Sequence, residues 1–189
     1  MMKKFFLFIF MIMALKGFTQ IDQVLPAAPE PPRLVNDFTG RALSATDRDK
    51  LEQKLVKFDQ RADVQMAVVI MDSAYGYSSE VYARALANKW GIGDQQKNNG
   101  IIILVTTGGG EGKRDLTIQL GKAYASYPVN DVLNEIIGEM IPLFKEGKMY
   151  EGLEKGTDMI MEAIDKLNEM TGSSSQHASL FSIVLNKAG

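Results

Sequence analysis

The chain has 189 residues, among them 21 basic and 23 acidic residues, one histidine and no cysteine. Without cysteine the chain can have neither a disulfide framework nor a lipoprotein anchor, and thiol chemistry is excluded, so stability must come from a packed core. No basic stripe interleaved with aromatic residues is present, so nothing indicates nucleic-acid binding.

Residues 1–19 have the pattern of a signal peptide. A basic head containing Lys3 and Lys4 precedes an apolar run from Phe5 to Leu15, which is too short to span a bilayer. We predict cleavage just before Gln20 and a periplasmic or secreted protein. Loss of three lysines would leave 18 basic residues against 23 acidic ones, a net charge of −5. No transmembrane segment is predicted beyond this signal.

The next segment, residues 20–33, contains four prolines between Leu25 and Pro32, which favour an extended chain with few hydrogen bonds. We predict a linker there, followed by one globular domain over residues 34–170. Residues 171–189 are predicted to form a flexible Ser-rich tail, in which the apolar hexad 180–185 could add an edge strand.

Helices and strands alternate through the globular part. Ser44 with Asp47 is typical of a helix start, and Gly91 is typical of a helix end. Hydrophobic periodicity predicts the following elements: a helix over 45–61, a strand over 64–71, a helix from Ser78 or Ser79 to Trp90, strands over 101–105 and 116–120, and helices over 130–145 and 150–170.

The strand over 101–105 is apolar at every position, so we expect it to be covered on both faces. Because a strand, a helix and a strand follow one another, the two strands should form a right-handed parallel unit. The alternating pattern of 116–120 predicts an antiparallel edge hairpin. The predicted fold is α/β, a three-layer α/β/α sandwich with a small mixed sheet.

The residue inventory excludes several kinds of chemistry. The only histidine, His177, lies in the predicted tail, so the core has no material for a Ser-His-Asp triad or a histidine-ligated zinc site. The glycine-rich run 108–114 lacks the Gly-Lys-Ser/Thr sequence that leads into a helix in a phosphate-binding loop. We therefore interpret it as a hairpin tip.

Oxygen ligands remain available. Asp37, Asp94 and Asp131 lie in three predicted loops, and such loops can converge at the end of a sheet. Together with Asn98 they would suit Ca²⁺ or Mg²⁺. Each aspartate taken alone is more typical of a helix cap or a turn, so the hypothesis concerns the cluster.

Several motifs together resemble the TPM domain family over residues 34–167. They are Val35-Asn36-Asp37-Phe38-Thr39-Gly40, Gln65-Met66-Ala67-Val68-Val69, Tyr82-Ala83, Lys89-Trp90-Gly91-Ile92-Gly93-Asp94, Asn99-Gly100-Ile101-Ile102-Ile103 and Ile141-Pro142-Leu143-Phe144-Lys145-Glu146-Gly147. The resemblance implies an extracytoplasmic or thylakoid-lumenal α/β/α domain, often tethered to a membrane. Relatives have been linked to photosystem II repair, Ca²⁺ binding and acid phosphatase activity.

Matched motif by motif, the family's aspartates fall on Asp37 and Asp94, and Asp131 is a near match to a third. The sequence departs from the family at Gly121-Lys122-Ala123-Tyr124-Ala125, where many relatives have Gly-Tyr-Gly-Leu-Glu. If that loop borders the site, Lys122 would weaken cation binding or favour an anionic ligand.

Three functional hypotheses follow. The first is an exported, non-enzymatic accessory domain that binds Ca²⁺ at the carboxylate cluster and supports an assembly with an unidentified membrane-associated protein. The alternative is a metal-assisted acid phosphatase that hydrolyses phosphomonoesters. The third is a structural interaction domain whose aspartates only cap helices.

Overall fold

The computed structural model describes residues 20–108 and 115–186, with side chains described as far as Thr171. The predicted signal peptide, the tip of the glycine-rich run and the His177 side chain lie outside the described residues. The chain divides into two compact units, one up to Ser126 and one from Tyr127 onward. Each unit is described by itself.

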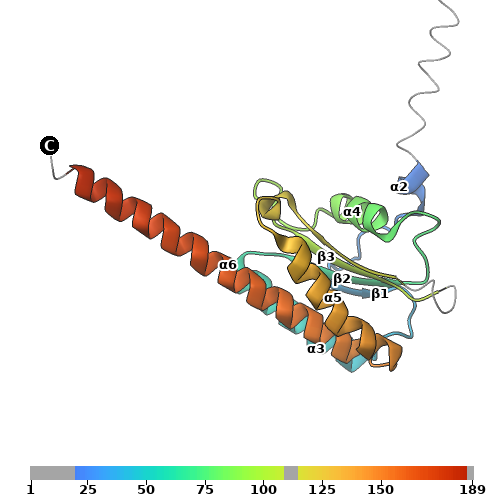
Figure 1. The fold of residues 1–189 in the computed structure, drawn as a ribbon. Helices are drawn as coiled ribbons and strands as arrows, with labels where there is room; N and C mark the ends of the chain where they lie inside the picture. The colour runs from blue at the N-terminus through green and yellow to red at the C-terminus, as the bar shows by residue number, and fades with distance from the viewer. Residues whose placement is uncertain (1–19, 109–114, 187–189) are drawn as a thin grey trace, which may run out of the picture. The chain divides into compact units, whose positions relative to one another are not determined.

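The first unit contains a four-stranded sheet in the order β1-β2-β3-β4 (Figure 1). The first three strands, β1 (Val35–Asp37), β2 (Met66–Met71) and β3 (Ile101–Thr106), are parallel. The fourth, β4 (Asp115–Leu120), is antiparallel to β3. The predicted mixed sheet, with its parallel unit and its antiparallel edge hairpin, is confirmed.

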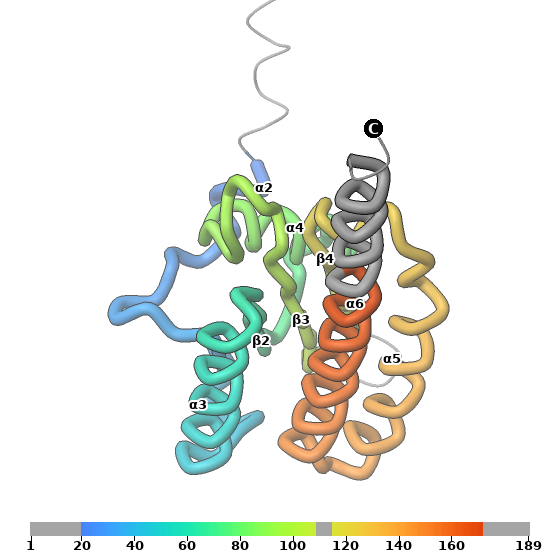
Figure 2. Tube along the Cα trace, turned by 90° about the vertical axis from the view of Figure 1, so that its left-hand side faces the viewer, coloured from blue at the N-terminus to red at the C-terminus, as the bar shows by residue number. Residues whose placement is uncertain are grey.

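Two helices cover this sheet. Helix α3 (Ala45–Ala62) begins after Ser44, whose side chain accepts a hydrogen bond from the backbone N–H of Asp47. Helix α4 (Ser79–Trp90) begins in the same way after Ser78 and ends at Gly91, which has a φ of 67°. Figure 1 shows α3 and α4 on opposite faces of the sheet, and Figure 2 shows the same elements from the side. This is the predicted α/β/α arrangement.

Both faces of the two central strands are buried, as the apolar pattern of β3 predicts. Alternate residues of β2 and β3 pack with α4 in one cluster: Val69, Met71, Ile102 and Leu104 with Tyr82, Ala83 and Leu86. The residues between them, which include Val68 and Ile103, point to the opposite face and are fully buried as well. This packing makes β2 and β3 the centre of the hydrophobic core.

The edge strand β1 was not predicted as a strand, because three residues are too few to show a periodic pattern. It pairs with β2 through Val35 opposite Val68. Its start is held by Glu52 of α3, whose carboxylate accepts hydrogen bonds from the backbone N–H groups of Leu34 and Val35. The loop carrying Asp37 therefore leaves the sheet from a fixed position.

The segment that the sequence analysis assigns to a linker begins with a short helix, α2 (Gln20–Val24). Leu25, directly after it, is buried in the cluster formed by α4, β2 and β3. Figures 1 and 2 both show α2 next to α4. The first part of the predicted linker is therefore packed onto the domain.

The second unit is a pair of helices, α5 (Val129–Lys145) and α6 (Met149–Asn186). The helices approach closely where Gly152 faces the Phe144 ring and Gly156 faces the Met140 side chain. Helix α6 extends to Asn186, through the segment predicted to be a tail with an optional strand. Within the described part of the chain, no helix has both the length and the apolar character needed to cross a membrane.

Candidate functional site

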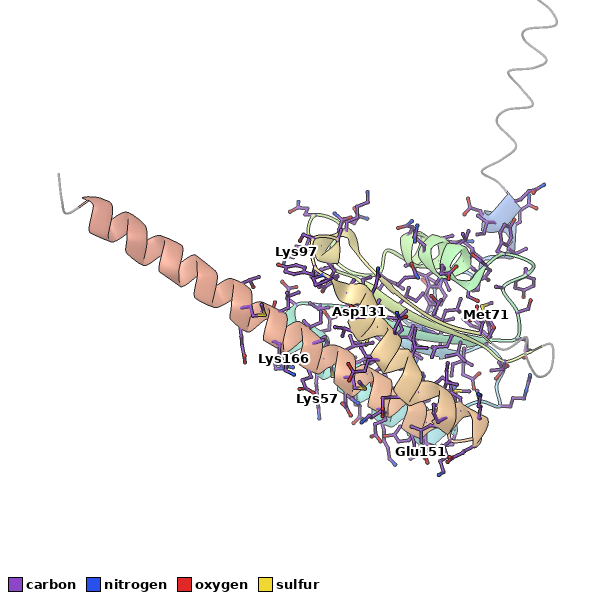
Figure 3. The ribbon with its side chains drawn as sticks, in the orientation of Figure 1. Lys57, Met71, Lys97, Asp131, Glu151 and Lys166 are labelled. Carbon is purple, nitrogen blue, oxygen red and sulfur yellow. The ribbon has the colours of Figure 1, made fainter. Side chains whose placement is uncertain are left out.

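The sheet topology separates two of the predicted ligands. Asp37 ends β1 opposite Ile70, near the carboxyl end of β2. Asp94 precedes β3, whose first residue, Ile101, pairs with Met66 at the start of β2. Four residues of strand span about 13 Å, so Asp37 and Asp94 lie at opposite ends of the sheet. Figure 3 shows Met71 and Lys97, which mark these two ends, far apart.

The predicted convergence of Asp37 and Asp94 is therefore wrong. In a parallel βαβ unit, the loop that follows one strand and the loop that enters the next strand are at opposite edges. Asp37 was expected in a loop, whereas it is the last residue of the strand β1. Asp131 is exposed in the first turn of α5, in the second compact unit. Within residues 20–108 and 115–171, no three aspartate, glutamate or histidine side chains gather as a metal site would require.

Asp37 organises its own loop. Its Oδ1 accepts hydrogen bonds from the backbone N–H groups of Thr39 and Gly40 and from the Thr39 hydroxyl, at 2.6–3.2 Å. Its Oδ2 accepts from the backbone N–H groups of Ala42 and Leu43, at 2.9 and 3.0 Å. A carboxylate that accepts five hydrogen bonds has little capacity left for a cation.

The ionised form of Asp37 is favoured by these contacts. Partial burial raises the pKa of the carboxyl, but the hydrogen bonds from Thr39, Leu43 and Ala42 outweigh burial and hold the pKa below its ordinary value of 3.8. The loop therefore keeps this carboxylate charged to a lower pH than that of an ordinary aspartate.

Asp94 and Asn98 lie in one turn at the other end of the sheet. Asp94 Oδ1 accepts hydrogen bonds from the backbone N–H groups of Gln96 and Lys97, both at 2.8 Å. These bonds lower the pKa of Asp94, which is fully exposed. The Asn98 side-chain amide donates to the carbonyls of Gln95 and Gln96. The structure thus brings together two of the four predicted ligands, Asp94 and Asn98.

Close backbone contacts hold this turn against the domain. A Cβ atom added at Gly93 would lie 2.3 Å from the nitrogen of Gly100, and one at Gly121 would lie 2.0 Å from the Asn98 carbonyl oxygen. The Gly93 N–H also donates to the side chain of Gln65. The family-like glycines therefore allow three stretches of backbone to touch.

Asp63 and Lys97, which are not among the ligands predicted from the sequence, also belong to this end of the sheet. Asp63 caps the end of α3 in a left-handed conformation, with φ of 54°. The Lys97 ammonium donates a hydrogen bond to the Asp63 carboxylate. This bond raises the pKa of Lys97, and the negative charge of Asp94 raises it further. One ammonium thus interacts with two exposed carboxylates, Asp63 and Asp94. The only sequence signal for Asp63 is its position one residue after the helix.

The segment that departs from the family, Gly121-Lys122-Ala123, is hydrogen-bonded to the Asp94 turn and to the start of β3. Gly121 donates its N–H to the carbonyl of Gly100, and Ala123 donates its N–H to the carbonyl of Asn98. Lys122 is exposed at the start of the short helix η2 (Lys122–Tyr124). The altered loop therefore adds a cation beside the Asn98 turn.

Comparison with known families and structures agrees with this fold. The family model of the TPM domain matches residues 35–163. The chain belongs to the TPM domain family. The match begins at β1 and ends within α6, so it includes the sheet, both covering helices and the turn of Asp94. No curated protein matches the chain.

Three solved structures are similar to this chain. The N-terminal domain of a P. gingivalis protein is 27% identical over 74% of this chain and 83% of its own, with a TM-score of 0.58. The N-terminal domain of the cg2496 protein from Corynebacterium glutamicum is 15% identical over 74% and 85%, with a TM-score of 0.53. The BA42 protein from Bizionia argentinensis is 19% identical over 66% and 82%, with a TM-score of 0.52.

Proposed function

We propose that this TPM-domain protein is an exported accessory protein that binds Ca²⁺ weakly at the Asp94 turn and supports a membrane-associated assembly. The observation that carries the cation proposal is that two exposed carboxylates lie next to Lys97: Asp63 pairs with its ammonium, and Asp94 accepts a hydrogen bond from its backbone N–H. The side-chain oxygen of Asn98 in the same turn offers a further ligand. Carboxylate and amide oxygens suit Ca²⁺ or Mg²⁺.

The proposed affinity is low for a physical reason. The Asp63 side chain is 73% exposed and that of Lys97 is 51% exposed, so the resident ion pair is well solvated. A divalent cation must displace the Lys97 ammonium and keep several waters as ligands. Such a partly formed site corresponds to dissociation constants of about 10⁻⁴–10⁻³ M, the range of extracellular calcium modules.

The proposed site differs from the cluster predicted from the sequence. Asp37 is excluded because its oxygens accept hydrogen bonds from its own loop. Asp131 is not part of the proposed site, since it belongs to the other compact unit. The bound cation would hold the Asp94 turn in one conformation and present it to a partner.

Isothermal titration of the mature protein with CaCl₂ tests the proposal. Asp94→Asn should abolish the binding heat, and Lys97→Met should strengthen binding because the competing ammonium is gone. Asp72→Asn is the control, since Asp72 pairs with Arg41 at the other end of the sheet. Unchanged binding in Asp94→Asn, or weaker binding in Lys97→Met, would contradict the proposed site.

The phosphatase alternative is an outcome of a parallel assay with a chromogenic phosphate ester, with and without chelator. Turnover that requires the cation and is lost in Asp94→Asn would replace the accessory role by a hydrolytic one. Export has its own readout: a secreted or periplasmic mature chain should begin at Gln20 by N-terminal mass spectrometry.

A further inference from the structure

We propose that α4 carries a peptide-binding surface, which the chain fills with its own residues 20–26. This segment, called the latch below, precedes the family match, which starts at residue 35. It comprises α2, Leu25 and Pro26, and it packs on the outer side of α4 (Figure 1). The surface recognises a short peptide by one apolar anchor and several main-chain carbonyl groups.

The apolar anchor is Leu25. Its side chain is only 5% exposed and packs in the cluster that contains Tyr82 and Leu86 of α4. Ile21 and Val24 of the latch are partly buried against the same cluster. The anchor thus enters the core of the domain from a segment outside the sheet and its covering helices.

Three side chains of α4 donate hydrogen bonds to latch carbonyls. The Tyr82 hydroxyl donates to the Val24 carbonyl at 2.9 Å, and the Trp90 indole N–H donates to the Pro26 carbonyl at 3.0 Å. The Lys89 ammonium donates to the carbonyls of Asp22 and Leu25, at 3.0 and 2.9 Å.

These donors are seven and eight residues apart, so they lie along one side of α4. Because every peptide offers carbonyl groups, they select a backbone conformation, while the pocket of Leu25 selects the apolar side chain. Docking gains free energy from the burial of Leu25 and from a few hydrogen bonds. This gain is offset by the conformational entropy that residues 20–26 lose when they become ordered. This balance makes docking reversible, whereas the other members of the cluster, which belong to α4, β2 and β3, stay packed on one another when Leu25 leaves.

Trp90 provides a direct readout, because it is the only tryptophan in the chain. Release of the latch removes its hydrogen bond to Pro26 and exposes the indole ring. In the full mature chain, Leu25→Asp should shift Trp90 emission to longer wavelength and raise its quenching by acrylamide. Ala28→Asp is the matched control, since Ala28 is exposed and the same charge is added nearby. It should leave both signals unchanged.

A second measurement separates a reversible latch from a fixed part of the core. A synthetic peptide of residues 20–30, added to the Leu25→Asp protein, should restore wild-type quenching with saturation, and the same peptide carrying Leu25→Asp should not. Tyr82→Phe, which removes only the hydroxyl, should weaken the peptide's effect.

The proposal is overturned if Leu25→Asp leaves Trp90 unchanged or if the peptide has no effect. It is also overturned if Leu25→Asp abolishes cooperative unfolding of the whole domain, since residues 20–26 would then be an integral part of the core.

Discussion

The carboxylates of Asp37 and Asp94 both hold turns, but they differ in how much of each side chain the turn uses. Both oxygens of Asp37 accept hydrogen bonds from its loop, whereas the backbone N–H groups of Gln96 and Lys97 both donate to Oδ1 of Asp94. Asp37 therefore has a structural role at one end of the sheet. At the other end, Oδ2 of Asp94 does not take part in the hydrogen bonds to Gln96 and Lys97. This difference is the reason why the proposed cation site includes Asp94 and leaves out Asp37.

Asp37→Asn should lower the free energy of unfolding by about 2–3 kcal/mol, because the amide cannot accept hydrogen bonds on both sides. Asp72→Asn at the same end of the sheet should cost less than about 1 kcal/mol, since its ion pair with Arg41 is exposed. Urea unfolding followed by circular dichroism measures both values. Equal losses in the two variants would show that the Asp37 loop contributes nothing special.

The lowered pKa of Asp37 also predicts a pH dependence. A carboxyl whose pKa is lower in the folded state contributes stability above its unfolded value, here 3.8, and loses that contribution as the pH falls through the folded pKa. The stability difference between wild type and Asp37→Asn should therefore be constant at neutral pH and shrink below pH 3.8. Urea titrations at several pH values measure it, and a difference that grows on acidification would contradict the assignment.

At the scale of elements, the connection from α4 to β3 is held in place by close contacts between backbone segments. Gly100 lies against the carbonyl of Ile92, and Gly121 lies against the carbonyl of Asn98. Both neighbours are backbone atoms, which have little room to move. The entry to the central strand β3 and the exit from β4 are thus joined at one point.

Gly121→Ala should destabilise the protein, because the added Cβ would meet a backbone oxygen at 2.0 Å. We expect a loss of about 1–3 kcal/mol, typical of overpacking. Gly138→Ala in α5 is the matched control, since no atom lies within 4 Å of its added Cβ. It should stabilise the protein by about 0.5–1 kcal/mol through helix propensity. Thermal unfolding of both variants tests the contrast, which fails if both shift in the same direction.

Most elements could be predicted from local signals. The caps at Ser44 and Ser78, the stop at Gly91 and the apolar run of β3 are local, and the structure has each of them where the sequence indicates. The strand β1 and the docking of Leu25 could not be predicted, because both depend on a distant partner: β1 on β2, and Leu25 on α4. The four prolines between Leu25 and Pro32 predicted a linker, but they gave no sign of the helix α2 or of where Leu25 packs.

The candidate site was predicted less well than the fold. Asp94 and Asn98 share a turn because they are close in sequence, whereas Asp37 and Asp94 could be placed only with the strand order in hand. Asp63 and Lys97 were missed because their pairing joins the end of α3 to a later turn. Residues that meet across sequence distances of this size leave no local pattern.

For the whole molecule, the absence of cysteine leaves the hydrophobic core as the main source of stability. Leu86→Ala in α4 should cost about 2–5 kcal/mol, because Leu86 is fully buried and leaves a cavity. Val81→Ala in the same helix should change stability by less than about 0.5 kcal/mol, since Val81 is 51% exposed. Chemical denaturation compares them, and a small loss in Leu86→Ala would show that α4 is not part of the core.

The Glu52 contact at the edge of the sheet has a consequence for solubility. An exposed edge strand invites pairing with strands of other molecules, and such pairing begins at unpaired N–H groups. At the start of β1, two of these groups already donate to a carboxylate of the neighbouring helix. Since β1 is only three residues long, a foreign strand would find few donors there, and this border of the sheet is protected against intermolecular aggregation.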